Sequence, residues 1–324
     1  MIIGQDRAVG QFAEAWASRR LHHAWLLAGP KGVGKASFAA QAARRVLAEA
    51  AGPAFDLPGI QTPASHPALS LLDAGSHPDF RWLERLPREK GEGLARDITI
   101  DQVRSLGQFL SLAPALSDWR VVGIDAMDDL AGPGANALLK ILEEPPPNTL
   151  FFLVAHAPGR LLPTIRSRCR RLDFKALADD AMAAILEAEA LELKGGERDR
   201  IVGLAGGSAG RALALAGLDL AKLEEQAIAI LRRGDPTNQL RSGLASELGK
   251  KASAERYAAF LELAPGLVAH EAKTLSGDRL ERALDAYAKA RELAAVAPRL
   301  ALDPAATVFQ LGGILASVAE PRVP

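Results

Sequence analysis

The sequence lacks several features that mark secreted or nucleic-acid-coating proteins. Its 324 residues include a single cysteine, Cys169, which excludes an internal disulfide and fits a reducing compartment. The 39 basic and 39 acidic side chains balance, which argues against a dedicated DNA-coating protein but leaves room for a local basic patch. Aromatic residues make up only 5%, so few side chains are available to stack on bases.

Long apolar segments are also missing. The longest runs, such as residues 24–28 and 150–155, are far too short to cross a bilayer. The N-terminal stretch MIIGQDRAVGQF lacks the basic and then apolar regions of a secretory signal. We therefore expect a cytoplasmic protein.

The first half of the chain alternates short apolar runs with helical periodicity. Residues 24–28, 121–124 and 150–154 are predicted strands, with a weaker candidate at 80–83. Such alternation predicts an α/β domain in which a parallel sheet is covered by helices on both faces. We place this domain at residues 1–175.

Beyond this domain the strand signals vanish, and the rest of the chain is predicted to be helical. Residues 176–218 form a small helical unit and residues 219–324 an all-α domain, with Pro236, Pro265 and Pro304 predicted to separate its helices.

Three further segments of the first half have predictions from their composition or from single residues. Residues 51–78 are rich in Pro, Gly, Ala and Ser, which favours an irregular excursion. Residues 84–97 are strongly charged and are predicted to form a solvated loop or hairpin. Asp101 is predicted to cap a helix that ends near Ser111.

The most informative motif is GPKGVGKA, which runs from Gly29 to Ala36 after a predicted strand and opens a helix. Gly29, Gly32 and Gly34 suit a loop whose backbone N–H groups surround phosphate oxygens, and Lys35 suits the outer phosphates. The hydroxyl that ordinarily binds Mg²⁺ is replaced by Ala36. The pattern predicts a phosphate-loop architecture. Two roles for this loop stay open: it binds a nucleotide, or it is a turn that only shapes the strand-to-helix junction.

A second candidate site follows the strand at 121–124. Asp125 stands at the end of this strand, where a metal-facing carboxylate is expected, and Ala126 follows it. Asp128 and Asp129 are displaced along the chain, and we interpret them as a solvated turn.

Several sequence blocks occur together in one order. They are HAWLLAGP at 23–30, GPKGVGKA at 29–36, WRVVGIDAMD at 119–128, NALLKILEEPP at 136–146 and LLPTIRSRC at 161–169. Together they resemble the AAA+ clamp-loader family of bacterial DNA polymerase III, and within it the delta-prime type of subunit. The motifs cover about residues 1–215, and the helical tail matches only by architecture. The resemblance implies an AAA+ RecA-like P-loop domain, a small helical lid and a C-terminal collar that holds a ring together.

The resemblance also implies roles for individual residues. Hydrolysing members carry Ser or Thr where this chain has Ala36, and Glu where it has Ala126. General-base assistance is typically worth ~10²–10⁴ in rate, so we expect the isolated chain to hydrolyse ATP poorly or not at all. In the family, the arginine of the Ser-Arg-Cys motif reaches a neighbouring subunit's ATP, and here it is Arg168, between Ser167 and Cys169.

Arg168 and Cys169 also have less specific interpretations. The alternative for Arg168 is a solvated basic run that leads into a strand, together with Arg166, Arg170 and Arg171. For Cys169 we favour a small, inert packing residue.

Two departures from the family pattern affect the expected cofactors. Many members carry a four-cysteine zinc module after the P-loop helix, whereas this chain has only His66 and His77 there, so we predict no zinc. The sensor arginine of the family's second domain aligns with Gly210, and Arg211 follows it. No cofactor is expected to be required, and binding of ATP or ADP to the degenerate loop is left open.

The sequence is compatible with three functions. The first is a non-hydrolysing clamp-loader subunit in a hetero-oligomeric ring with ATPase subunits and a clamp-opening subunit, acting on a sliding clamp and on primed DNA through the complex. The alternative is a self-sufficient AAA+ ATPase or loader motor with a degenerate but active site. A DNA-binding module is the third, with Arg81–Arg96 as its candidate contact, although a solvated loop is the favoured account of that stretch.

Overall fold

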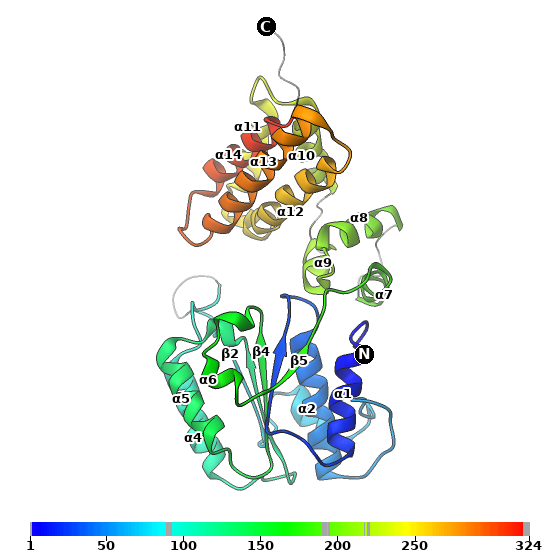
Figure 1. Cartoon of the computed structure of the whole chain (residues 1–324), viewed down its shortest axis with the longest axis vertical. Coiled ribbons are helices and arrows are strands. Elements are labelled where there is room, and N and C mark those ends of the chain that lie inside the picture. Colours follow the sequence, from blue (N-terminus) through cyan, green and yellow to red (C-terminus); the bar gives the residue numbers. More distant parts are fainter. Residues whose placement is uncertain are drawn as a thin grey trace. The chain divides into compact units, whose positions relative to one another are not determined.

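The computed structural model describes residues 2–88, 93–189, 193, 195–216, 218 and 221–319 (Figure 1). The chain divides into two compact units, one made of residues 1–181 with 207–210 and the other of residues 182–206 with 211–324. The three-domain division at 175 and 218 stays a prediction.

The first unit is built on a five-stranded parallel sheet with the order β2-β3-β4-β1-β5. All neighbouring strands pair in parallel, as the alternation of strands and helices predicts. The strands are β1 (Ala24–Ala28), β2 (Phe80–Glu84), β3 (Arg120–Asp125), β4 (Thr149–Ala155) and β5 (Arg170–Asp173). Sequence patterns placed the first four within two residues.

Helices cover both faces of this sheet (Figure 1). α1 (Asp6–Ala17) and α2 (Lys35–Ala51) lie on one face, and α4 (Ile100–Ser111) and α5 (Gly132–Glu143) lie on the other. The short helices are α3 (Pro67–Asp73), α6 (Pro163–Arg166) and the 3₁₀ turns η1 (Met127–Asp129) and η2 (Pro158–Arg160).

Alternate residues of the central strands build two separate cores. On one face Trp25 packs with Phe12 and Phe38. The ring centroids of Phe12 and Phe38 are 5.8 Å apart. On the other face Leu26 belongs to the core formed with α4 and α5. Because both faces are covered, all five residues of β1 are buried, which is why this strand appears as a continuous apolar run.

The start of α4 differs from the prediction. Thr99 caps the helix by accepting a hydrogen bond from the Gln102 backbone N–H at 3.2 Å, and the Gln102 side chain accepts from the Thr99 N–H at 3.0 Å. This reciprocal pair satisfies two free backbone donors, so Asp101 lies in the first helical turn and the prediction that it is the cap was wrong.

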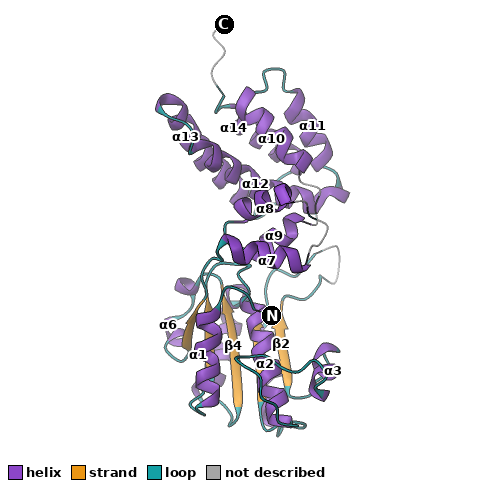
Figure 2. Cartoon of the chain, turned by 90° about the vertical axis from the view of Figure 1, so that its right-hand side faces the viewer, coloured by secondary structure: helices purple, strands orange, loops and turns teal. Residues whose placement is uncertain are grey.

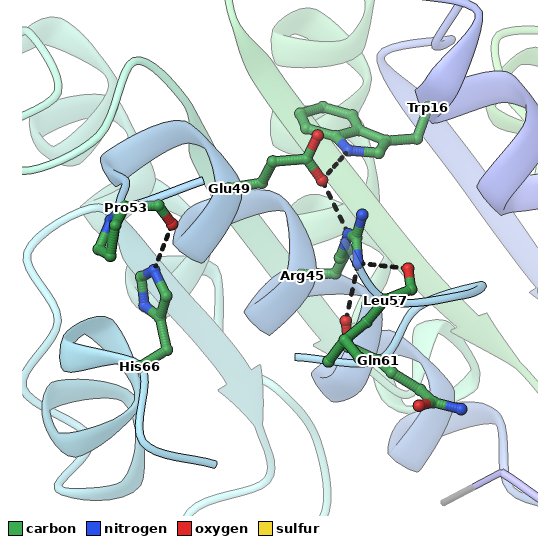
Figure 3. Close-up of polar contacts among 7 residues, drawn as sticks. All are labelled: Trp16, Arg45, Glu49, Pro53, Leu57, Gln61 and His66. Atoms are coloured by element: carbon green, nitrogen blue, oxygen red, sulfur yellow. Dashed lines mark hydrogen bonds and ion pairs between the residues drawn. The ribbon is translucent and has the colours of Figure 1, made fainter. Parts of the chain in front are cut away.

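The excursion at 51–78 is more ordered than its composition indicates, because it contains α3. A side-chain network ties it to α2 (Figure 3). Arg45 donates to the carbonyl oxygens of Leu57 and Gln61, both at 2.9 Å. Glu49 accepts hydrogen bonds from Arg45 at 2.8 Å and from the Trp16 indole at 2.9 Å. The Arg45 guanidinium also lies 4.6 Å from the Phe55 ring centroid, so one arginine organises the segment.

Replacing Arg45 by alanine is expected to loosen residues 53–66 without unfolding the sheet. The variant leaves two backbone carbonyls without their charged donor, a loss of about 1–3 kcal/mol. Amide hydrogen exchange in this segment should accelerate by about tenfold or more. Arg44→Ala is the matched control, because Arg44 makes a more exposed ion pair with Asp73. Equal exchange in both variants would contradict the assignment.

The charged stretch at 84–97 lies only partly within the described residues. Pro87 and Leu94 form an antiparallel bridge, which confirms a hairpin at its base. Residues 89–92, part of the predicted DNA-contacting stretch, are outside the described range.

In the second unit, every secondary-structure element of the described residues is helical (Figure 2). The helices that supply its residues are α7 (Asp179–Glu189), α8 (Gly195–Ala205), α9 (Ala209–Ala216), α10 (Ala221–Arg233), α11 (Gln239–Leu248), α12 (Ala254–Ala272), α13 (Gly277–Val296) and α14 (Pro304–Ala316), with the turn η3 (Lys251–Ser253).

Prolines begin and interrupt these helices in different ways. Asp303 caps α14 by accepting from the Ala306 N–H at 2.8 Å, and Pro304 is the first helical residue, as expected. Pro265 lies inside α12, so the prediction of a break there was wrong. The flanking Phe260 and Val268 are fully buried, and their packing outweighs the lost backbone hydrogen bond.

Candidate functional site: a phosphate-type loop and an arginine at opposite sheet edges

The predicted phosphate loop follows β1 at the carboxyl edge of the sheet. The Gly29 N–H donates to the Ala155 carbonyl at the end of β4 with a distance of 3.2 Å, which joins two strand ends. Gly32 and Gly34 have φ angles of +79° and +95°, a region that favours glycine. α2 begins at Lys35, so its N-terminus faces the loop.

Lys35 is turned back onto its own loop. Its ammonium group donates to the carbonyl oxygen of Gly29 at 2.7 Å and to that of Pro30. The side chain is buried, and burial lowers the pKa of the ammonium to about 8, although Asp125 and Asp128 act in the opposite direction. The lysine therefore stabilises the turn through two backbone acceptors.

The lowered pKa of Lys35 predicts a pH-dependent stability. The unfolded chain binds the lysine proton more tightly than the folded chain, so the free energy of unfolding should rise from about pH 8 to about pH 10.5 and be flat below that window. The gain has an upper limit of roughly 3 kcal/mol, reached above about pH 10.5. Urea unfolding of the native chain and of Lys35→Met across this range measures it. Parallel profiles for the two proteins would contradict the prediction.

Asp125 ends β3 at the same edge of the sheet as the loop. Burial raises the pKa of its carboxyl, and Glu84, its register partner on β2, adds to the rise while Lys35 opposes it. The next residue, Ala126, is 2% exposed and belongs to the hydrophobic core beneath α2. The position next to the acidic residue is thus filled by an apolar contact and offers no carboxylate to a water molecule.

Asp128 and Asp129 lie in the turn η1, as the solvated-turn interpretation expects, and they also make specific contacts. The exposed Asp128 carboxylate accepts hydrogen bonds from the backbone N–H groups of His156 and Ala157, the latter at 2.7 Å. Asp129 forms an ion pair with Arg85 at 3.1 Å. Both carboxylates join segments at the ends of neighbouring strands.

The segment 207–210 packs directly against the loop. The Ser208 hydroxyl donates to the Lys31 carbonyl at 3.0 Å, and the Gly210 N–H donates to the Gly32 carbonyl at 2.9 Å. A Cβ atom at Gly210 would lie 3.1 Å from the Gly32 Cα, so the two backbones are in close contact. The position that aligns with the family's sensor arginine is therefore a backbone contact with the loop.

Gln5 precedes α1 and contacts the phosphate-type loop, a role that sequence patterns did not reveal. Its position before α1 indicates a helix cap, yet its side chain makes no cap hydrogen bond. The buried amide donates instead to the carbonyls of Val33 at 3.2 Å and Lys175 at 2.8 Å. These partners lie 28 and 170 residues away, a distance in sequence that no local pattern reveals.

Arg211 is engaged within the second unit. Its guanidinium donates to the Glu262 backbone carbonyl at 2.6 Å, and its Nε lies 3.4 Å from the Glu262 carboxylate.

Arg168 belongs to a separate cluster between α6 and β5. Its guanidinium pairs with the Glu143 carboxylate at 2.9 Å and donates to the Thr164 carbonyl at 2.9 Å. About a third of the side chain is exposed. Ser167 caps α6, and its hydroxyl donates to the Thr164 carbonyl at 3.0 Å. The motif thus holds the arginine at the surface.

The sheet topology separates Arg168 from the phosphate loop. β5 runs parallel to β1, with Trp25 opposite Arg170, so Arg168 lies at the amino edge of the sheet. The loop begins at Gly29, beyond the carboxyl end of β1. A strand rises about 3.3 Å per residue, so the two edges are roughly 13 Å apart along β1. Arg168 and the loop therefore occupy different ends of the strands.

The neighbours of Arg168 are packing and pairing residues. Burial raises the pKa of the Cys169 thiol to about 12, so the thiol stays protonated at neutral pH. Arg170 lies 4.9 Å from the Trp25 ring, and Arg171 pairs with Asp173 at 2.6 Å. These contacts are more specific than those of a solvated basic run.

His66 and His77 lie in the segment where many family members carry a zinc module, and both make hydrogen bonds to the backbone. His66 and His77 each use Nδ1 to accept a backbone N–H. Within the described ranges, no group of three or more His, Cys, Asp or Glu side chains could hold a metal ion.

Among the residues that the structure describes, every helix is too short or too polar to cross a membrane.

Comparisons with known proteins match this architecture. A family model described as DNA polymerase III, delta subunit, matches residues 4–178. The DNA polymerase III subunit delta' of Pseudomonas aeruginosa is 40% identical over 150 residues, covering 45% of this chain and 41% of that protein. Subunit tau of Bacillus subtilis is 30% identical over 219 residues, covering 66% of this chain and 36% of that protein. The chain thus spans less than half the length of both relatives.

A third relative aligns over most of both chains. The DNA polymerase III subunit delta' of Escherichia coli is 30% identical over 301 residues, which is 86% of this chain and 84% of that protein. This alignment reaches well beyond the first unit into the helical one. The chain therefore belongs to the family of DNA polymerase III delta' subunits.

Proposed function

We propose that this chain is a non-hydrolysing subunit of the DNA polymerase III clamp loader, which supplies Arg168 to the ATP site of a neighbouring subunit. The observation that carries the proposal is the separation between Arg168 at the amino edge of the sheet and the phosphate-type loop at the carboxyl edge. An arginine that lies at the opposite ends of the strands from its own loop is suited to a nucleotide held by another chain.

The loop itself supports a role without hydrolysis. Ala36 offers no hydroxyl for Mg²⁺, and Ala126 offers no general base. Lys35 is bonded to its own loop, and Gly210 contacts Gly32 directly. We infer that the loop is a fixed structural joint, and that a nucleotide is not required for its shape.

The partners follow from the same proposal. The chain would act in a hetero-oligomeric ring with ATPase subunits and a clamp-opening subunit, while a sliding clamp is opened and placed on primed DNA. Residues 219–324 would form the collar that holds the ring. The delta' and tau names of the relatives support this assignment.

The experiment that tests the proposal is ATP hydrolysis by the reconstituted complex, with native chain or with Arg168→Ala. The variant should assemble normally and lose hydrolysis at one neighbouring site. The isolated chain should show no turnover. Steady hydrolysis near ~1 s⁻¹ by the isolated chain would favour the self-sufficient ATPase instead.

A further inference from the structure

The guanidinium of Arg168 is held at two points by two different elements. One terminal nitrogen lies 2.9 Å from the Glu143 carboxylate, and the other donates to the Thr164 carbonyl at 2.9 Å. Glu143 is the last residue of α5, and Thr164 lies in α6. We propose that Glu143 is a positioning residue that presents Arg168 to the neighbouring subunit's ATP, an inference that rests on the proposed function.

The position of Glu143 is fixed by the fold. α5 runs back from the carboxyl edge of the sheet, and its buried Leu138 and Leu142 anchor it in the core. The helix ends at Glu143, just before a run of prolines and the start of β4. Glu143 therefore reaches the amino edge of the sheet, where Arg168 lies.

This arrangement leaves the arginine prepared for a phosphate. A guanidinium carries five N–H donors. The two contacts of Arg168 therefore leave further donors for the phosphate oxygens of ATP that the neighbouring subunit holds. Arginine has a long, rotamer-rich side chain, and ordering such a side chain opposes binding. Glu143 orders it before the neighbour docks, so loss of Glu143 should slow the reaction about 3- to 10-fold.

The test uses the reconstituted complex and compares kcat and KM for ATP. Glu143→Ala should lower kcat at the one ATP site that Arg168 serves about 3- to 10-fold with KM unchanged, because Arg168 acts on the transferred phosphoryl group. Glu143→Gln keeps an amide oxygen in the place of the carboxylate oxygen and should retain at least about half of the native kcat. In an Arg168→Ala background, Glu143→Ala should have no further effect. Glu144→Ala is the matched control, because Glu144 is the next residue and is exposed.

The outcomes separate this inference from the proposed function. If Arg168→Ala abolishes hydrolysis at the neighbouring site and Glu143→Ala changes nothing, the positioning role is wrong and the finger stands. If Arg168→Ala has no effect, the proposed function itself fails. Activity of Glu143→Gln above native would show that the carboxylate competes with phosphate for the arginine, which overturns positioning. If Glu143→Ala does not assemble, Glu143→Gln decides, and a rate for Glu143→Gln below about half of the native rate contradicts positioning by hydrogen bonding.

Discussion

Replacing Arg168 by alanine is expected to reduce ATP hydrolysis at the neighbouring site by about 10³-fold or more. Arginine fingers are worth ~10³–10⁵ in rate because a permanently charged, planar guanidinium meets charge that develops on the transferred phosphoryl group. The total rate of a ring with several ATP sites should fall only by the share of the site that Arg168 serves. Single-turnover hydrolysis by the reconstituted complex measures this loss.

Two further variants make the result specific to Arg168. Arg168→Lys keeps the charge without the planar fork, so it should restore only part of the rate. Arg166→Ala removes an exposed arginine from the same short helix and should behave as the native chain. Gel filtration must show intact complexes for all three proteins. Hydrolysis that is unchanged in a fully assembled Arg168→Ala complex would make the arginine structural.

Replacing Gly29 by alanine is expected to destabilise the first unit by about 3 kcal/mol or more. A Cβ atom at this position would lie 2.1 Å from the Phe174 carbonyl oxygen, and φ is +156°. The clash is with backbone that is itself held by a hydrogen bond from the Phe174 N–H to the Ala28 carbonyl at 2.8 Å. Overpacking costs about 1–3 kcal/mol and a strained backbone conformation about as much again.

Thermal unfolding measures this loss without any nucleotide. The melting temperature should fall by roughly 6–12 °C, since 1 kcal/mol corresponds to about 2–4 °C in a domain of this size. Gly159→Ala is the matched control, because it is an exposed glycine with open space around its Cβ position. If Gly29→Ala melts as the native chain does, the glycine is not required by packing, and its place in the motif would have to be explained by a ligand.

The contrast between Gly29 and Gly34 shows what a motif leaves open. Both match the phosphate-loop pattern, yet of these two only Gly29 lies against other backbone, that of Phe174 just after β5, whereas the space around Gly34 is open. A sequence pattern records which residue type stands at a position. It does not distinguish a glycine needed for a ligand from a glycine needed for packing.

Local physics determined much of the first unit from the sequence alone. Apolar runs identify strands that are buried on both faces, and alternation with helices predicts a parallel sheet, because a parallel connection needs a crossover. The absence of a hydroxyl at Ala36 and of a carboxylate at Ala126 could also be deduced directly. Arg168 was singled out only through the family resemblance of its flanking motif, and the structure places it directly after a short capped helix.

Only the tertiary structure decided which side chains meet. The pairing of Arg168 with Glu143 joins residues from two helices, and the Gln5 amide reaches backbone 170 residues away. Asp128 binds backbone at the end of β4, whereas its charge and neighbours indicate a solvated turn. Sequence periodicity reports which face of an element is buried, but the partner of a polar side chain depends on strand order and register, which long-range packing sets.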